Sequence, residues 1–167
     1  ISGVPEYVTE AFPSSNAGTY VIKVSIGTLQ SDRYNFQFVD GALTVDKAVL
    51  GVRAENKVKV YGDLNPALTV TFNGFKNSES LATSGVTGTP SLNTTVTETT
   101  GVGIYDISIA AGSLSSINYS FDLTKGVFEV TKASITVSAD DKTKIYGSQN
   151  PVFTASYSGF RNGEDLS

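Results

Sequence analysis

The sequence predicts an all-β, mostly β protein made of tandem small β modules of about 85 residues, each an immunoglobulin-like (Ig-like) sandwich or a β-grasp-like fold. One observation is a repeated stretch: KVKVYGDLNP at residues 57–66 returns as KTKIYGSQNP at residues 142–151. The other is composition, because Val, Ile, Phe and Tyr alternate with polar residues between turns rich in Gly, Ser and Thr. At most one short helical turn per repeat is expected.

The repetition extends well beyond the ten residues. Residues 17–48 align without a gap to residues 102–133, with 12 of 32 positions identical, and residues 48–82 align to residues 133–167, with 15 of 35 identical. Such unbroken register predicts a structural repeat.

The repeated stretch reads as a strand followed by a corner. Charged and β-branched residues alternate in Lys57-Val58-Lys59-Val60, which predicts a solvated face bearing the lysines. A tyrosine ring can anchor a small core, while glycine and Asn-Pro pairs mark turns. The favoured interpretation is a structural corner, and a ligand-contacting loop is the alternative. The residues of the two predicted corners are Tyr61, Gly62, Asn65, Pro66, Tyr146, Gly147, Asn150 and Pro151.

Three strands are predicted before residue 46. Proline at positions 5 and 13 makes Val4–Phe12 an edge strand, and Thr19–Ile26 alternates cleanly. Tyr34–Phe38 is predicted to be an alternating strand, with Tyr34, Phe36 and Phe38 facing inward, followed by a hairpin at Asp40-Gly41. The predicted core of residues 47–131 comprises Leu50, Val52, Tyr61, Leu68, Val70, Phe72, Phe75, Tyr105, Ile107, Ile109, Tyr119, Phe121, Phe128 and Val130.

One stretch per repeat is not clearly β. It reads GFKNSESL at residues 74–81 and GFRNGEDL at residues 159–166. Asn77 and Asn162 are expected to cap a single helical turn, with Glu79 and Glu164 near its positive end.

The boundaries of the repeat can be drawn in two ways. We expect a complete repeat at residues 47–131 (the central segment). Residues 1–46 (the N-terminal segment) are then the C-terminal part of one repeat, and residues 132–167 (the C-terminal segment) the N-terminal part of the next. The alternative is two whole modules, residues 1–85 and 86–167. Neither Gly nor Pro lies between Ala42 and Leu50, which predicts a connection that limits bending.

Composition excludes several kinds of chemistry. Without histidine or cysteine there is no Ser-His-Asp or Cys-His catalytic site and no ordinary zinc site, so neither a catalytic residue nor a cofactor is assigned. Carboxylate-only calcium stays open at Glu55-Asn56 and the equivalent Asp140-Asp141, although solvated acids are the favoured interpretation.

Charge and apolar content also limit the partners. A net charge of −4 argues against nucleic acid, and no apolar run is long enough for membrane insertion. The lack of methionine suggests a processed or excised piece of a longer protein.

Several residues resemble the MBG-type repeats (YGX variety) of large bacterial surface proteins. The matching positions include Lys59-Val60-Tyr61-Gly62, Asn65-Pro66, Gly74-Phe75 and their second copies at residues 144–147, 150–151 and 159–160, while Ser148 replaces the Asp found at position 63. The resemblance implies secreted or cell-surface, adhesin-like proteins of mostly β modules, without known catalytic residues.

The favoured function is a non-catalytic repeat module of a large extracellular or cell-surface bacterial protein, acting as a stiff spacer or stalk. Its partners would be neighbouring repeats of the same chain. The alternative is a carbohydrate- or host-protein-binding module, which needs exposed aromatic side chains. An enzyme is the third and least favoured class, because a module of this size offers little room for a cleft.

Overall fold

The computed structural model describes residues 1–166, and strands are the only regular elements there. The all-β prediction is therefore confirmed, and the arrangement of several small sheets is consistent with a β sandwich. No helix in this range is long and apolar enough to cross a bilayer. Compact packing divides these residues into two units: residues 1–52, 72–91 and 111–123, and residues 53–71, 92–110 and 124–166.

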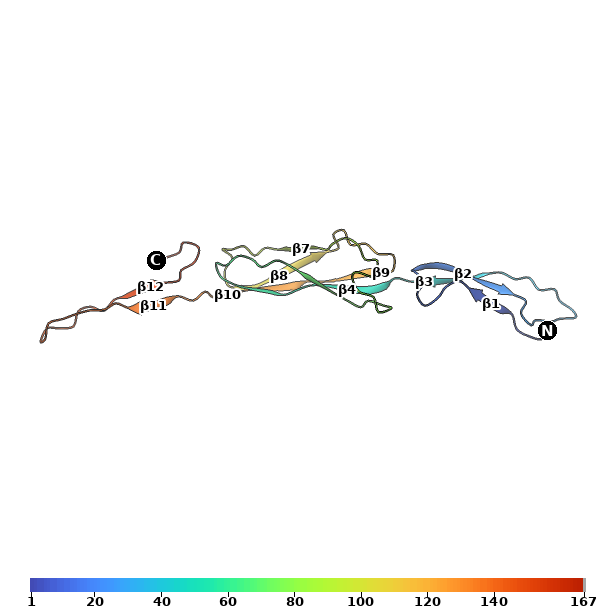
Figure 1. The fold of residues 1–167 in the computed structure, drawn as a ribbon, viewed down its shortest axis with the longest axis horizontal. Helices are drawn as coiled ribbons and strands as arrows, with labels where there is room; N and C mark the ends of the chain where they lie inside the picture. The colour runs from blue at the N-terminus through green and yellow to red at the C-terminus, as the bar shows by residue number, and fades with distance from the viewer. Residues whose placement is uncertain (167) are drawn as a thin grey trace. The chain divides into compact units, whose positions relative to one another are not determined.

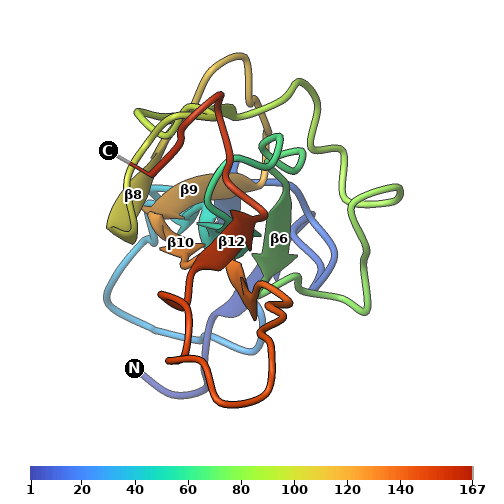
Figure 2. The same cartoon turned by 90° about the vertical axis from the view of Figure 1, so that its left-hand side faces the viewer.

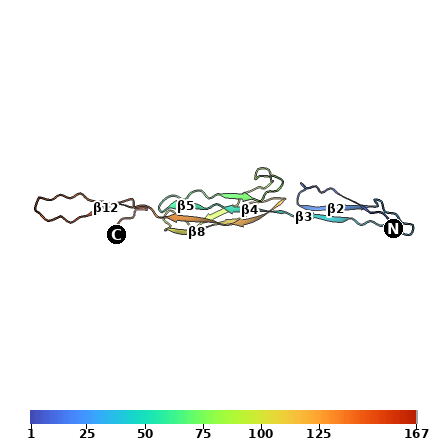
Figure 3. The same ribbon diagram turned by 90° about the horizontal axis from the view of Figure 1, so that it is seen from below.

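The N-terminal segment forms one antiparallel sheet in the first unit (Figures 1 and 3). Its strand order is β1 (Glu6–Thr9), β2 (Gly18–Ser25) and β3 (Gly41–Val45). The edge position of β1 confirms the expectation drawn from its flanking prolines.

The predicted strand at Tyr34–Phe38 and its hairpin are wrong. Residues 34–38 are irregular, and the Tyr34 side chain is 65% exposed. The counterpart of this stretch, β9 (Tyr119–Thr124), pairs with β4 (Ala48–Ala54) of the same central segment. The N-terminal segment supplies no counterpart of β4, and within residues 1–166 no strand pairs with residues 34–38. Gly41 begins β3 with an ordinary negative φ, whereas a two-residue hairpin turn of type I′ needs positive φ.

The central segment contains two sheets. One has the strand order β5 (Lys57–Val60), β10 (Gly126–Thr131), β8 (Gly103–Ala110) and β7 (Ser91–Thr94). The other has the order β6 (Val70–Asn73), β4 and β9. Strand β10 pairs in parallel with β5 and antiparallel with β8.

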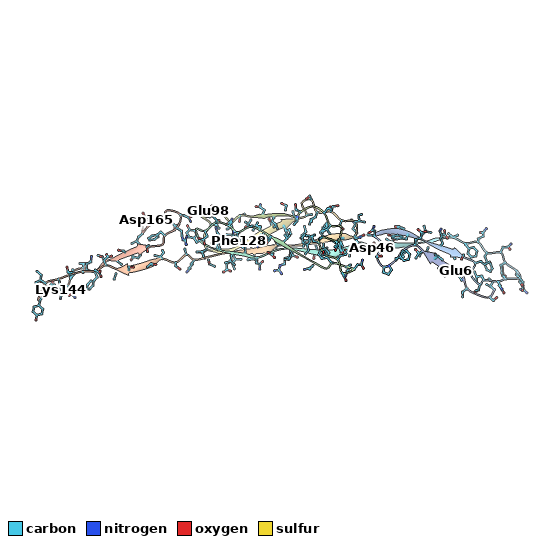
Figure 4. The ribbon with its side chains drawn as sticks, in the orientation of Figure 1. Glu6, Asp46, Glu98, Phe128, Lys144 and Asp165 are labelled. Atoms are coloured by element: carbon cyan, nitrogen blue, oxygen red, sulfur yellow. The ribbon has the colours of Figure 1, made fainter. Side chains whose placement is uncertain are left out.

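The hydrophobic core of the second unit lies against the first of these sheets. Ala54, Val96, Ile107, Phe128 and Val130 are buried there, and Phe128 lies among the strands in Figure 4. In the first unit Leu50, Val52 and Tyr119 are buried, and the rings of Phe75 and Tyr119 form a T-shaped pair with centroids 5.9 Å apart. Every residue of the predicted core is buried or half-buried; Ala54 and Val96 are additional members.

The lysine face of β5 points inward, which contradicts the expectation of a solvated face. Lys59 is buried and Val58 is 59% exposed. The reason is the register with β10: Lys57 and Lys59 lie opposite Phe128 and Val130, and therefore share their buried face. The lysine stems cover apolar surface, and the Lys59 ammonium donates to the carbonyls of Asp63 (3.0 Å) and Thr97 (2.6 Å).

The C-terminal segment forms a single hairpin, β11 (Thr136–Ala139) with β12 (Ala155–Ser158), whose second strand is labelled in Figure 2. The division of the chain into repeats stays a prediction. All strands nevertheless fall within one of the three segments: β1 to β3, β4 to β10, and β11 with β12.

We predict that Phe128→Ala lowers the free energy of unfolding of the central segment by about 3–5 kcal/mol, because a fully buried ring is removed. Val127→Ala, on the neighbouring outward-facing position of β10, should cost less than about 1 kcal/mol. Urea unfolding measured by tyrosine fluorescence compares the two. Equal losses would place Phe128 outside the core.

Candidate functional site

The two stretches expected to contain a helical turn form tight turns instead. Asn77 and Ser78 have φ of 51° and 58°, and the Glu79 amide donates to the Lys76 carbonyl at 2.9 Å. Positive φ at both central residues is the signature of a type I′ turn, which cannot start a right-handed helix. The expected N-cap role of Asn77 is therefore wrong.

The C-terminal copy adopts the same turn. Asn162 and Gly163 have φ of 53° and 76°, and the Glu164 amide donates to the Arg161 carbonyl at 2.9 Å. Asn162 is therefore not an N-cap either. Both turns present a basic residue at the first position and a glutamate at the fourth.

The first turn lies where the N-terminal segment joins the central segment, within the first unit. A cavity of about 270 Å³ there is lined by residues of both segments, including Ala17, Ala48 and Lys76. Asn118 joins the segments: its Oδ1 accepts from the Ala17 amide and its Nδ2 donates to Asn16, both at 2.9 Å.

Glu79 of this turn accepts a hydrogen bond from the buried Tyr119 hydroxyl at 2.7 Å. The same hydroxyl accepts from the Lys76 amide at 2.8 Å. Burial raises the pKa of Tyr119, and the neighbouring carboxylate of Glu79 adds to the rise. The neutral phenol thus fixes both ends of the turn.

The second turn lies where the central segment joins the C-terminal segment, within the second unit. Glu164 accepts from the Tyr61 hydroxyl, and Arg161 lies 3.3 Å from the Asp63 carboxylate. A smaller cavity of about 200 Å³ is lined by residues of both segments.

Gly62 is required here for two reasons. Its φ of 85° is unfavourable for other residues, and a Cβ at this position would lie 2.5 Å from Cβ of Arg161. The tyrosine-glycine corner and the next segment therefore meet closely.

The two junctions share four lining positions at an 85-residue interval. The first contains Ala17, Ala48, Lys76 and Glu79, and the second contains their counterparts Val102, Ala133, Arg161 and Glu164. The glutamate accepts from Tyr119 in the first junction and from Tyr61 in the second. Tyr119 and Glu79 belong to the same segment, whereas Tyr61 and Glu164 come from different segments, so of these two hydrogen bonds the second crosses a junction.

The MBG domain (YGX type) family matches residues 50–129 and 135–167, more than half of the sequence. The chain belongs to this family of MBG domains. No curated protein and no solved structure is significantly similar to it. The family consists of repeat-type domains, which is compatible with a module without catalysis.

The predicted corners of the MBG domain form the same turn in both copies. The Asp63 amide donates to Val60, and the Ser148 amide donates to Ile145. With glycine at positive φ in third place, each is a type II turn. Tyr61 lies at the second junction, whereas Tyr146 is fully exposed.

The Asn-Pro pairs lie apart from these junctions. The Asn65 side chain donates to the Val96 carbonyl at 2.6 Å, while Pro66, Asn150 and Pro151 are exposed. Pro66 and Pro151 thus end the corner without lining either cavity.

The paired acids considered for calcium are held by hydroxyl groups. Glu55 accepts from Thr69 and Asp140 from its counterpart Thr154. These bonds lower the pKa of Glu55, with help from Lys57, and Ser156 together with Thr154 lowers that of Asp140. No cluster of three acidic side chains suited to a metal occurs within residues 1–166.

Sequence reasoning did not assign Lys76, Glu79, Asn118 or Tyr119 to a junction. One signal was available. The spacing of a basic residue, Asn and Glu is identical in both copies, and Asn162-Gly163 is a strong type I′ pair.

We predict that Thr69→Val makes the MBG domain less sensitive to acid. A lowered pKa stabilises the fold above the unfolded value, about 4.3 for glutamate, and this stability is lost as pH falls through the folded value. Removing the hydroxyl removes the largest cause of the lowering. Unfolding free energy measured from pH 7 to pH 3 should fall less in the variant than in the parent. The control, Thr71→Val at an exposed position of β6, should follow the parent curve, and a Thr69→Val curve parallel to that of the parent would contradict the assignment.

Proposed function

We propose that this chain is a non-catalytic module of a large secreted or cell-surface bacterial protein, in which repeated MBG domains act as a stiff spacer. The observation that carries the proposal is the recurrence of the same four lining positions at two junctions, 85 residues apart. A flexible tether between domains needs no such repeated set of positions.

The connections themselves support stiffness. Only Asp46 and Lys47 separate β3 from β4. The Ala48 amide donates to the Asn118 carbonyl at 2.9 Å, and Lys47 Nζ donates to the Ser116 carbonyl at 2.8 Å. These two bonds fix the start of the central segment, so only the short stretch at Asp46 and Lys47 is left to bend.

An ion pair at the second junction helps to fix which surfaces of the two segments meet. Arg161 and Asp63 are both about half exposed, so this ion pair contributes little energy by itself. The ion pair instead holds the turn at Arg161 of one segment next to the Tyr-Gly corner of the other. Lys76 offers the same charge at the first junction.

Recognition of carbohydrate or of a host protein is the second candidate. The exposed rings of Tyr7, Tyr34 and Tyr146 favour it, because aromatic faces stack on sugars. Dose-dependent binding on a glycan array would support this candidate. Protease shaving of intact source cells tests the proposed location: release of the domain supports a surface position, and protection contradicts it.

The stiffness of the first junction can be measured with two spin labels, because the chain contains no cysteine. Lys23→Cys and Asp122→Cys place labels at exposed sites on either side of it. We expect one narrow distance distribution by pulsed electron resonance.

Asn118→Ala removes both side-chain hydrogen bonds to residues 16 and 17, so the distribution should broaden. Asn35→Ala, at an exposed irregular position, is the control and should leave it narrow. A broad distribution in the parent chain would refute the spacer role.

A further inference from the structure

The two terminal segments expose residues that the central segment buries. Leu50 and Val52 are 0% exposed, whereas their counterparts Ile135 and Val137 are 49% and 57% exposed. Each terminal segment thus carries one half of the apolar surface that the central segment encloses.

The central segment shows how the two halves fit. Its core cluster joins Ala54, Tyr61 and Leu68 from the first half to Ile107 and Phe128 from the second. The halves also share a sheet, since β5 of the first pairs in parallel with β10 of the second. Neither half buries these residues without the other.

The N-terminal segment contains the corresponding empty groove. A cavity of about 510 Å³ is lined by Tyr7, Ile22 and Val24, among others. Their counterparts Leu92, Ile107 and Ile109 belong to the core cluster of the central segment, together with Ala54 and Leu68. The groove therefore offers the surface that Ala54 and Leu68 cover in the central segment, and it fits the counterparts of these two residues.

Those counterparts lie in the C-terminal segment. They are Ala139, on the hairpin strand β11, and Phe153, which is 72% exposed. Lys144, at the outer end of the same hairpin, is also exposed (Figure 4). The hairpin thus presents both the apolar and the basic residues that the central segment uses.

We propose that the C-terminal segment of one copy of this chain docks into the N-terminal segment of a second copy, rebuilding between molecules the packing seen inside the central segment. Residues 142–145 pair in parallel with β3 of the second copy, as β5 pairs with β10. Phe153 and Ala139 fill the groove. The association is head to tail, and it does not depend on the spacer role.

Polar groups favour an occupant that carries the residue pattern of this repeat. Lys59 donates to the Thr97 carbonyl, and Asn65 donates to the Val96 carbonyl. At the 85-residue offset, the donors correspond to Lys144 and Asn150 of one copy. The acceptors correspond to the carbonyls of Phe12 and Ala11 of the other copy.

One of the two hydrogen bonds that Lys59 makes in the central segment already has its equivalent inside the C-terminal segment. Lys144 keeps its bond to the Ser148 carbonyl at 3.3 Å, the equivalent of the bond from Lys59 to Asp63. The matching acceptors lie in the N-terminal segment. An unrelated apolar partner would satisfy none of these donors.

Engineered cysteines test the register. Val58 lies opposite Glu129, so Thr143 of one copy should lie opposite Thr44 of the other. Cα atoms of paired strands are close enough for a disulfide. A tagged Thr44→Cys chain mixed with an untagged Thr143→Cys chain should give a mixed disulfide dimer under mild oxidation.

Ser158→Cys replaces Thr143→Cys in the control. Its counterpart Asn73 lies on β6, which is not in the sheet of β5 and β10, so this cysteine should not lie opposite Thr44→Cys. A yield at least about tenfold above this control supports the proposal. Equal yields overturn it. A Thr44→Cys, Thr143→Cys double variant that closes only within single chains also overturns the intermolecular form.

A second pair of variants tests the interface without a crosslink. Ile22→Lys places a charge in the groove, whereas Val21→Lys alters the adjacent outward position, where the central segment carries Asp106. Sedimentation across a dilution series should show concentration-dependent association of the parent and of Val21→Lys, and a loss of at least about tenfold in affinity for Ile22→Lys. A parent chain that stays monomeric at every concentration overturns the proposal.

Discussion

The parallel pairing of β5 with β10 is the interaction on which the rest of this MBG domain depends. It joins segments 72 residues apart, as in the bond from the Thr131 hydroxyl to the Lys59 carbonyl. It turns the stems of Lys57 and Lys59 toward Phe128 and Val130, so the same register that forms the sheet also closes the core. A one-residue slip would bring Val58 inward and leave the lysine donors without their carbonyl acceptors.

The same pairing places the junction. The Tyr61 amide donates to the Thr131 carbonyl at 2.9 Å and so extends the ladder to the last residue of β10. The Tyr-Gly turn therefore begins where β10 ends and the next segment starts. Tyr61 and Asp63 reach Glu164 and Arg161 for that reason. The register of β5 against β10 thus determines which residues face the core of the domain and which residues contact the following segment.

The sequence predicted those features that depend on local pattern or on repetition. Alternation identified the strands around Tyr20 and Ile107, and the 85-residue echo identified equivalent corners at Gly62 and Gly147. Features that depend on a distant partner were missed. The alternation in residues 57–60 predicts a solvent-facing Lys59 as long as its parallel neighbour β10 is not known. Alternation likewise predicts a buried Tyr34, although no strand within residues 1–166 pairs with residues 34–38. The junction residues were missed because a turn alone does not reveal what it touches.

The long separation between β5 and β10 has a consequence for synthesis of the chain. Pairings between distant segments form late, and residues 57–60 emerge from the ribosome well before residues 126–131. During that interval β3, the counterpart of β10, has already been made and competes for the same strand. The region that contains β3 (residues 17–48) and the region that contains β10 (residues 102–133) are identical at only 12 of 32 positions. Each departure from identity weakens this competition within one chain, and an array of identical copies would face it in full.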